Sequence, residues 1–575
     1  MKIRQDIKQK IEEALQGVGE ATDISFSVET PDNQDHGDYA TNIALLVAKA
    51  IGKNPLEIAD EIARNLQDER WEVSVAPPGF LNFRIADAHL QKSIEYVLEQ
   101  DDAWGTSAAG AGKTVMVEYF QLNIAKRPHI GHLRSAAIGD ALKRMFLSQG
   151  YHAVSDTHVG DWGTQFGILL HAYKDQGDAA LQEKIAGDPF EFLEDLYKRE
   201  NKRIEENPER RERAKQEFAK LERGDVENRK IWQWMVEVSM QKLTESAEQL
   251  GLLPFDEHKG ESSYEEVMLP IVEEALKRGV AEKKSDSAVV VDLTAEKLDE
   301  AVLIKSDGAT TYLLRDLAAI NYRNERWNFW KNLYVVDVRQ AHHFHQLFRV
   351  AELLGFDGAQ GSQQVEFGFM TLPEGAMSTR KGTAVALYQL LQDAERKARE
   401  IIREKNPALA DADAAARKVG VGAIKYFDLS HNRKSDIVFD WDKALSFEGN
   451  TGPYVQYTYA RLKSILRKNC LSGLPLAGIS AYGGIRFEDS ERRLAATILR
   501  YPEIIAEALS LLSPHVVAAY LYQLASTANE FYHAFSVLQE PDEAKRALRL
   551  VLVSTTALTL KNGMYLLGLE ALEKM

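Results

Sequence analysis

The chain has 575 residues, of which 45% are hydrophobic and 27% are charged, and its formal net charge is −16. A chain of this length exceeds what one hydrophobic core can serve, so we expect three or four domains. Its single cysteine, Cys470, excludes a disulfide within the chain and argues against a cysteine-based zinc site.

The composition predicts a soluble protein of a reducing compartment, and we expect a cytoplasmic location. No run of about 18 uncharged apolar residues occurs, which argues against a transmembrane helix. The acidic net charge does not exclude a nucleic-acid partner, because affinity for phosphate depends on local basic surface.

The N-terminal region, residues 1–110, predicts an α+β domain. Residues 39–51 have apolar side chains at helical spacing, and Asn54-Pro55 is typical of a helix start. Residues 73–85 alternate around a Pro-Pro-Gly turn and predict two strands.

Residues 111–384 alternate strand and helix patterns. Buried strands are expected at 115–120, 288–293 and 333–338, and a strong amphipathic helix at 133–149. This alternation predicts a Rossmann-like, doubly wound parallel sheet. A charge-rich helical stretch at about 171–260 is interpreted as an insertion, and residues 385–575 predict an α-helical bundle.

Two segments indicate chemistry. His129-Ile-Gly-His132 opens a helix after a strand, where unpaired N–H groups and partial positive charge suit phosphate. Gly131 permits a flat group such as adenine to approach the backbone. Far downstream, residues 377–382 (MSTRKG) form a loop whose basic groups could neutralise a leaving pyrophosphate. Taken singly, these segments could also be structural histidines and an exposed basic loop.

Together the two segments resemble the HIGH and KMSKS signatures of class I aminoacyl-tRNA synthetases. The surrounding sequence is similar to that of the arginyl-tRNA synthetases over nearly the whole chain, least so in the helical insertion. Matching stretches are residues 123–126 (NIAK), 158–167 (HVGDWGTQFG), 312–316 (YLLRD), 337–344 (DVRQAHHF) and 447–461 (FEGNTGPYVQYTYAR).

This resemblance implies a ligase that forms arginyl-tRNA from L-arginine, ATP with Mg²⁺ and arginine tRNA. An arginyl-adenylate is the implied intermediate, with AMP and pyrophosphate released. The family's arginine members need bound tRNA to activate the amino acid. We expect a monomer without zinc.

The resemblance also assigns roles to residues. His129 and His132 are expected to stabilise charge on the α-phosphate. The ATP site is expected to include His129, Gly131, His132, Met370, Met377 and Ser378. The arginine site is expected to include Asn123, His129, Glu261, Tyr312, Asp316 and Gln340. Carboxylates suit this substrate because a guanidinium presents a planar fork of donors, whereas lysine is a point charge.

For tRNA, the resemblance implies an elbow-binding N-terminal domain and an anticodon-binding bundle. The expected contacts are Phe80 and Asn82 in the former, and Tyr454, Tyr457, Arg461 and Met575 in the latter. The alternative is that the aromatic residues among them belong to the core.

The KMSKS position reads Ala376-Met-Ser-Thr-Arg380, so both of its lysines are missing. The hypothesis is that Lys126 supplies the catalytic charge, with Lys381 as the competing candidate and Arg380 beside it. Gln121-Leu122 stands where the family usually has Ser-Pro, so one contact to the substrate amino group is open.

Three alternatives stay open. The chain could be a class I synthetase for another amino acid, or a non-catalytic RNA-binding paralogue. His342, His343 and His345 could suggest a metal site, but we favour structural or substrate-site support and expect no metal.

Overall fold

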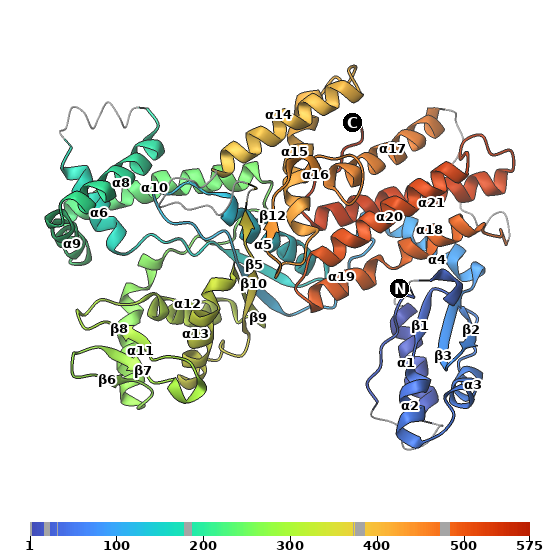
Figure 1. Ribbon diagram of the computed structural model, residues 1–575, viewed down its shortest axis with the longest axis horizontal. Helices are drawn as coiled ribbons and strands as arrows, with labels where there is room; N and C mark the ends of the chain where they lie inside the picture. The colour runs from blue at the N-terminus through green and yellow to red at the C-terminus, as the bar shows by residue number, and fades with distance from the viewer. Residues whose placement is uncertain are drawn as a thin grey trace.

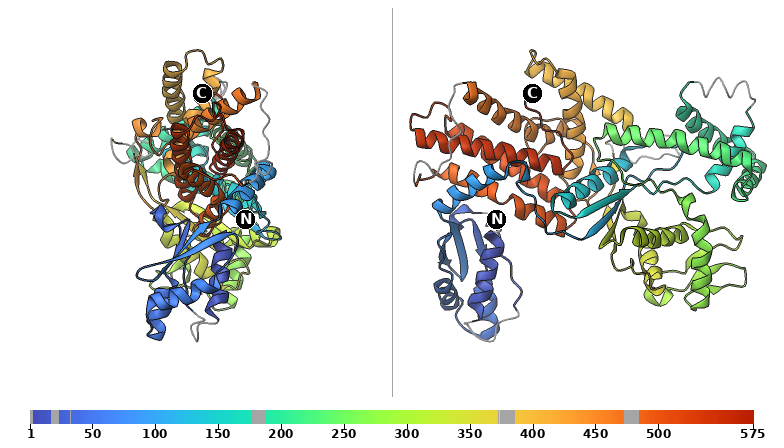
Figure 2. Two further views of the ribbon diagram at one scale, coloured as in Figure 1. Left: turned by 90° about the vertical axis from the view of Figure 1, so that its right-hand side faces the viewer. Right: turned by 180° about the vertical axis from the view of Figure 1, so that it is seen from behind.

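The computed structural model describes residues 3–16, 24–31, 33–176, 187–371, 373, 386–471 and 484–575. A parallel sheet lies near the centre of an elongated molecule (Figure 1), with helices α6 and α8–α10 at one end and the C-terminal helices at the other. The N-terminal domain lies under the C-terminal helices, as the view from behind in Figure 2 also shows. Within the described ranges, no helix is both long and apolar enough to cross a membrane.

The N-terminal domain is a small antiparallel sheet, in the order β1-β3-β2, with helices beside it. Asn54 caps α3 by accepting a hydrogen bond from the Leu56 N–H, as the Asn-Pro pair predicts. The strands predicted at 73–85 are confirmed. The elements are α1 (Ile3–Leu15), η1 (Gln34–His36), β1 (Tyr39–Thr41), α2 (Ile43–Ile51), α3 (Pro55–Asn65), β2 (Trp71–Ala76), β3 (Phe80–Ile85), α4 (Asp87–Gln100) and η2 (Asp101–Ala103).

The central sheet has the order β10-β9-β4-β5, and every pair in it is parallel. The chain runs from β4 to β5 on one side and later from β9 to β10 on the other. The strand order therefore reverses between β4 and β9, and ligands bind at the carboxyl ends of strands at such a point. The elements are β4 (Thr114–Glu118), α5 (Ile130–Ser148), β5 (His152–Asp156), α12 (Tyr312–Trp327), β9 (Lys331–Asp337), η5 (Val338–Gln340), α13 (Ala341–Leu353) and β10 (Ser362–Phe367).

The strand expected at 288–293 exists but does not join the parallel sheet, so that part of the prediction is wrong. Val289–Val291 forms β7 in a separate antiparallel sheet with β6 (Glu282–Lys283) and β8 (Ala301–Ile304). It packs into a second hydrophobic cluster with η3 (Glu261–Tyr264), α11 (Glu265–Lys277) and α12. A short apolar run does not reveal which sheet will bury it.

The stretch at about 171–260 contains the helices α8 (Pro189–Glu206), α9 (Glu209–Glu222) and α10 (Val226–Gln249), and α6 (Thr164–Lys174) begins before it. Ion pairs join them, such as Arg210 to Glu200 (2.6 Å) and to Asp175 (2.8 Å). A short η4 (Thr294–Glu296) precedes β8.

The C-terminal region is helical, as predicted. It comprises α14 (Leu387–Lys405), α15 (Ala412–Leu429), α16 (Trp441–Ala444), α17 (Gly452–Leu471), α18 (Asp489–Leu499), α19 (Tyr501–Ser510), α20 (His515–Ala534) and α21 (Glu543–Leu566). A short parallel pair, β11 (Met370–Thr371) with β12 (Ile437–Val438), connects it to the region of the parallel sheet.

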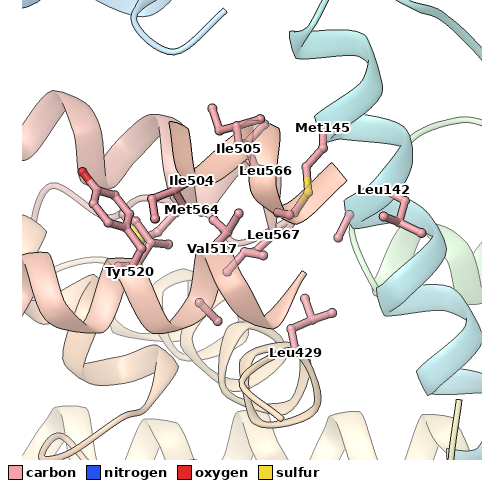
Figure 3. Packing of buried hydrophobic residues seen from close by; sticks show 14 of the residues in the cluster. Leu142, Met145, Leu429, Ile504, Ile505, Val517, Tyr520, Met564, Leu566 and Leu567 are labelled. Atoms are coloured by element: carbon pink, nitrogen blue, oxygen red, sulfur yellow. The ribbon is translucent and has the colours of Figure 1, made fainter. Parts of the chain in front are cut away.

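The helix predicted at 133–149 is confirmed as α5, but it is not amphipathic. It is buried all round from Leu133 to Phe146, because the C-terminal bundle covers the face opposite the sheet. Leu142 and Met145 share one buried cluster with Leu429, Val517 and Leu567 of the bundle (Figure 3).

The side chain of Arg134 on α5 binds the C-terminal bundle and nearby backbone carbonyls. The Arg134 guanidinium lies 2.7 Å from an Asp428 carboxylate oxygen and donates to the carbonyls of Gly368 (2.7 Å) and Ser435 (2.9 Å). Both side chains of the pair are almost completely buried. This contact fixes the bundle against the helix that carries His132.

Substituting Asp428 by alanine is expected to destabilise the fold by about 3–5 kcal/mol, because a buried guanidinium loses its counter-ion. The measurement is the shift of the urea unfolding midpoint followed by circular dichroism. Asp442→Ala removes an exposed acid of α16 and should change the stability by no more than about 0.5 kcal/mol. Equal shifts in the two variants would contradict a stabilising role for the buried pair.

The N-terminal domain is tied to the bundle by buried polar contacts as well. Arg492 of α18 donates to Asp38 (2.8 Å) and to the Ile85 carbonyl (2.6 Å). Glu503 of α19 accepts from the Arg4 backbone N–H (2.9 Å) and the Tyr39 hydroxyl (3.2 Å). These contacts set the position of the N-terminal domain relative to the bundle.

Candidate functional site

The ends of β4 and β5 lie beside β9 at the candidate site. Glu118, the last residue of β4, is in register with Asp156 of β5 on one side and Tyr334 of β9 on the other. Buried Arg323 of α12 lies 2.6 Å from Glu118 and 2.8 Å from Asp156. Since Asp316 lies seven residues, or about two helical turns, before Arg323, it faces the same edge of the sheet.

His129 is the N-cap of α5, and His132 lies in the first turn. The His129 Nδ1 accepts from the Gly131 N–H, and the His132 Nδ1 accepts from the His129 N–H, both at 3.1 Å. The two ring centroids are 3.9 Å apart. Each neutral ring therefore carries its proton on Nε2, so that both Nε2–H groups are available as donors.

Both imidazoles are held neutral. Burial lowers the pKa of His132 to about 3, and the nearby His129 adds to the effect. Burial, followed by the positive charges of Arg339 and Lys126, lowers the pKa of His129. Because Arg339 affects this pKa, His129 lies within electrostatic range of the segment that contains Gln340.

The signature loop, residues 119–129, connects β4 to α5. Gly160 and the segment 122–124 form backbone hydrogen bonds, from Gly160 N–H to Leu122 (2.9 Å) and from Ile124 N–H to Gly160 (3.3 Å). Asn123 in this segment is exposed. Gln121 donates to Glu118 (3.0 Å) and accepts from Ser135 (3.2 Å). Both ends of its side-chain amide therefore already have partners within the protein.

The helical insertion packs directly on this loop. The backbone N–H of Ala125, a residue with φ +57°, donates to the Ser239 hydroxyl of α10 (3.1 Å). Lys126 lies over the Tyr197 ring of α8, with Nζ 5.5 Å from the centroid, and Arg127 pairs with Glu194 of α8 at 2.6 Å. The sequence did not reveal these insertion residues, because nothing in a polar helix marks which side chains meet a distant loop.

Asp316 lies between two imidazoles. The His158 Nε2 is 3.2 Å from its Oδ1, and the His343 Nε2 is 2.6 Å from its Oδ2. The Asp316 carboxyl is buried, which by itself would raise its pKa, but the two histidines outweigh burial and hold the pKa well below its usual range. Asp316 is therefore an ionised acceptor at any physiological pH.

Glu261 is a second buried carboxyl beside Asp316. Burial raises its pKa to about 7, against the lowering effect of His158 and Arg315. Its Oε2 lies 3.5 Å from an Arg315 nitrogen yet has no hydrogen-bond partner, and neither has the Arg315 Nε. Buried polar atoms without partners cost free energy, so the site is one that a polar ligand would stabilise.

The remaining predicted arginine contacts lie at helix starts near Asp316. Tyr312 begins α12 and is 65% exposed, and Gln340, also exposed, immediately precedes α13, on which His343 lies. Met370 of β11 is buried. Four residues of the predicted site lie outside the described residues: Met377, Ser378, Arg380 and Lys381.

The predicted tRNA contacts differ in exposure. In the N-terminal domain, Phe80 is 38% exposed and Asn82 only 7%, and both line a cavity of about 420 Å³ beside residues 27–31. In the bundle, Arg461 donates to Asn529 (3.0 Å) and lies over the ring of the half-exposed Tyr457, 4.9 Å from its centroid.

Tyr454 is partly buried against the hydrophobic core, and its hydroxyl accepts from Asn529 (2.9 Å), which also binds Arg461. The carbonyl of the terminal Met575 accepts from Asn406 (2.9 Å), and the Met575 side chain packs on a hydrophobic cluster of α14 and α15. Among the residues with described positions, no group of three or more histidine, cysteine or acidic side chains is arranged to hold a metal ion.

Three family models match the chain. One described as tRNA synthetases class I (R), catalytic domain, matches residues 93–441, which is more than half of the chain. The chain belongs to the class I arginyl-tRNA synthetases. The Arginyl tRNA synthetase N terminal domain matches residues 2–85, and the DALR anticodon binding domain matches residues 455–575.

Curated relatives and solved structures agree with this family. The chain is 38% identical to the arginine–tRNA ligase of Clostridium perfringens, with 97% of each chain covered, and 39% identical to that of Clostridioides difficile, with 99% and 98% covered. It superposes on Thermus thermophilus arginyl-tRNA synthetase with a TM-score of 0.82 at 28% identity, over the full length of both chains. The Plasmodium falciparum enzyme gives 0.83 at 26% identity, with 100% and 99% covered. The predicted family, fold class and ligase activity are thereby confirmed.

Proposed function

We propose that the signature loop, the start of α5 and the starts of α12 and α13 form the active centre of an arginine–tRNA ligase. L-arginine, ATP with its Mg²⁺ and the 3′ end of arginine tRNA would meet there. The arginine carboxylate attacks the α-phosphate, pyrophosphate leaves, and a ribose hydroxyl of the tRNA takes the arginine from the adenylate with release of AMP.

The observation that carries the proposal is the buried carboxylate of Asp316, held between two imidazoles, with the buried carboxyl of Glu261 beside it. A guanidinium is a planar fork of five N–H donors that carboxylates pair with strong, charge-assisted bonds. Tyr312, one helical turn before Asp316, would close the side-chain pocket. Lysine would leave acceptors unpaired, and such mispairing can reduce the reaction rate by about 10⁴–10⁵.

The main-chain end of arginine would lie toward Asn123, His129 and Gln340. His129 and His132 would direct their Nε2–H groups at the oxygens of the α-phosphate, with Gly131 leaving room for the nucleotide. Because these donors are already fixed by the N-cap bonds, they cost no reorganisation when charge develops. Met370, Met377 and Ser378 complete the proposed ATP site.

The positive charge that the KMSKS lysine supplies elsewhere is proposed to come from Lys126, with Arg380 and Lys381 on the loop as secondary contributors. Lys126→Ala is expected to lower tRNA-dependent ATP–pyrophosphate exchange by about 100-fold, since one preorganised charge on the transferring phosphate is lost. Binding of tRNA should be nearly unchanged.

Lys381→Ala tests the competing candidate under the same conditions, and Lys283→Ala, in the exposed strand β6, is the matched control. A mild effect of Lys126→Ala together with a large effect of Lys381→Ala would transfer the role to Lys381.

For tRNA, we propose contact with the elbow through Phe80 and Asn82, and with the anticodon through Tyr454, Tyr457, Arg461 and Met575. The exposed rings of Phe80 and Tyr457 support this proposal, because aromatic faces suit unstacked bases. The domain limits 1–110, 111–384 and 385–575, with an insertion at about 171–260, belong to this proposal, as do a monomeric state, a cytoplasmic location and the absence of zinc.

The direct test is aminoacylation of purified arginine tRNA by the wild type and by Asp316→Ala, with ATP. Charging by the wild type and its loss in the variant support the proposal. Pyrophosphate exchange with another amino acid in place of arginine would point to a different synthetase. Absence of any ATP-dependent charging would indicate a non-catalytic paralogue.

A further inference from the structure

Both oxygens of Asp316 are held by imidazole nitrogens that come from different elements. His158 follows β5, His343 lies on α13, and Asp316 itself lies on α12. The distances are 3.2 Å from His158 Nε2 to Oδ1 and 2.6 Å from His343 Nε2 to Oδ2. The resemblance assigns neither histidine to arginine, although His343 is one of the three histidines for which we expect structural or substrate-site support.

This arrangement leaves acceptor capacity on the carboxylate. An ionised carboxylate offers about four lone-pair positions, two on each oxygen. The two imidazoles use one on each oxygen and fix the plane of the group. One position on each oxygen is left, which matches the two parallel donors of a guanidinium.

His158 is surrounded mainly by acids. It faces Asp316 and Arg323 on α12, Glu118 at the end of β4, and Glu261 and Tyr264 on η3, with Asp156 and Asp161 on its own segment. Its Nδ1 is buried without a hydrogen-bond partner. Although burial lowers its pKa, Glu118 and Asp316 outweigh burial and raise it to about 9. In the free protein at neutral pH, His158 is therefore an imidazolium.

We propose that His158 and His343 are positioning residues for the arginine side chain, and that His158 releases its proton to solvent when the guanidinium binds Asp316. The proposal rests on the proposed role of Asp316. Without this release, the substrate guanidinium and the His158 imidazolium would both be bound to the carboxylate of Asp316. The guanidinium cannot lose its proton in a protein, whereas an imidazolium can, so His158 is the group that loses its proton.

The proton is counted by calorimetric titration of the full-length enzyme with L-arginine at pH 8, in two buffers of different ionisation heat. We expect release of close to one proton per arginine from the wild type and much less than one from His158→Gln, whose amide keeps a donor of similar reach and in which Glu261 can still release part of a proton. Arginine affinity should rise by up to about tenfold per pH unit between pH 7 and pH 9 in the wild type and clearly less steeply in His158→Gln, in which Glu261 still titrates. Equal proton counts in the two proteins would overturn the proposal.

His343 is tested through the split between KM and kcat in tRNA-dependent pyrophosphate exchange. His343→Leu should raise the KM for arginine about tenfold or more, because a charged acceptor loses its donor, while kcat changes little. His343→Gln should restore most of the affinity. A KM for arginine that is equal in wild type and His343→Leu would contradict a positioning role.

The outcomes separate this proposal from the one on which it rests. If Asp316→Asn weakens arginine binding but the histidine variants bind and titrate like the wild type, only the positioning role is wrong. If Asp316→Asn has no effect, the arginine site itself is misassigned. Affinity for tRNA reports folding in each variant, and the glutamine variants decide the question should the leucine variant fail to fold.

Discussion

Asp316→Asn is expected to lower kcat/KM for arginine by at least about 100-fold, mostly through KM. The change is isosteric, so the shape of the helix is kept, but the negative charge that the substrate cation needs is removed and only one oxygen is left to accept from His158 and His343. The guanidinium then meets a neutral amide with one acceptor oxygen in place of two ionised oxygens. Loss of one partner of a buried charge pair is costly for this reason.

The measurement is tRNA-dependent ATP–pyrophosphate exchange at varied arginine concentration. Glu325→Gln makes the same acid-to-amide change on the exposed side of the same helix and should be close to wild type. The KM for ATP serves as an internal reference, because Asp316 is not expected to touch the nucleotide. A parallel rise in both KM values would indicate a distorted site and count against a specific arginine contact.

His129→Asn is expected to lower kcat for adenylate formation by about 10²–10³, the usual cost of one preorganised donor. Asparagine is a good N-cap, so its side-chain oxygen can replace Nδ1 as acceptor for the first-turn N–H and keep α5 intact. It is too short to place a donor where the Nε2–H of the imidazole lies. The substitution thus separates the catalytic role of His129 from its capping role.

Single-turnover adenylate formation at saturating ATP and arginine measures the effect on the chemical step. His152→Asn, at the exposed start of β5, is the matched control and should retain wild-type rates. The thermal midpoint of His129→Asn should be near that of the wild type. A large loss of stability with little loss of rate would make His129 a structural cap only.

Local sequence patterns predicted the helix starts, caps and turns that depend only on neighbouring residues. The strand before the signature loop and the helix after it bring His129 and His132 to one helix start, because residues three apart lie on one face of a helix. The capping Asn54 and the turn of the N-terminal hairpin are equally local. The family resemblance added Tyr312 and Asp316, which also lie one turn apart on a single helix.

Other features depended on partners distant in the sequence. Arg134 has the pattern of a solvent-facing residue on α5, yet it is buried against Asp428, which lies 294 positions later. Val289–Val291 is a strand in either kind of sheet, and only its neighbours decided which. The contact of Ser239 with Ala125 likewise required the insertion to fold back on the loop.

By itself the sequence determined the family, the order of the elements and the first helix turn that carries two imidazoles, since each follows from neighbouring residues or from motif order. Only the tertiary structure decided that His158 and His343, from two separate elements, meet on one carboxylate of a third. It also decided which charges of α5 are buried. Burial and ionisation are set by everything that surrounds a group in space, and spacing along the chain does not encode that environment.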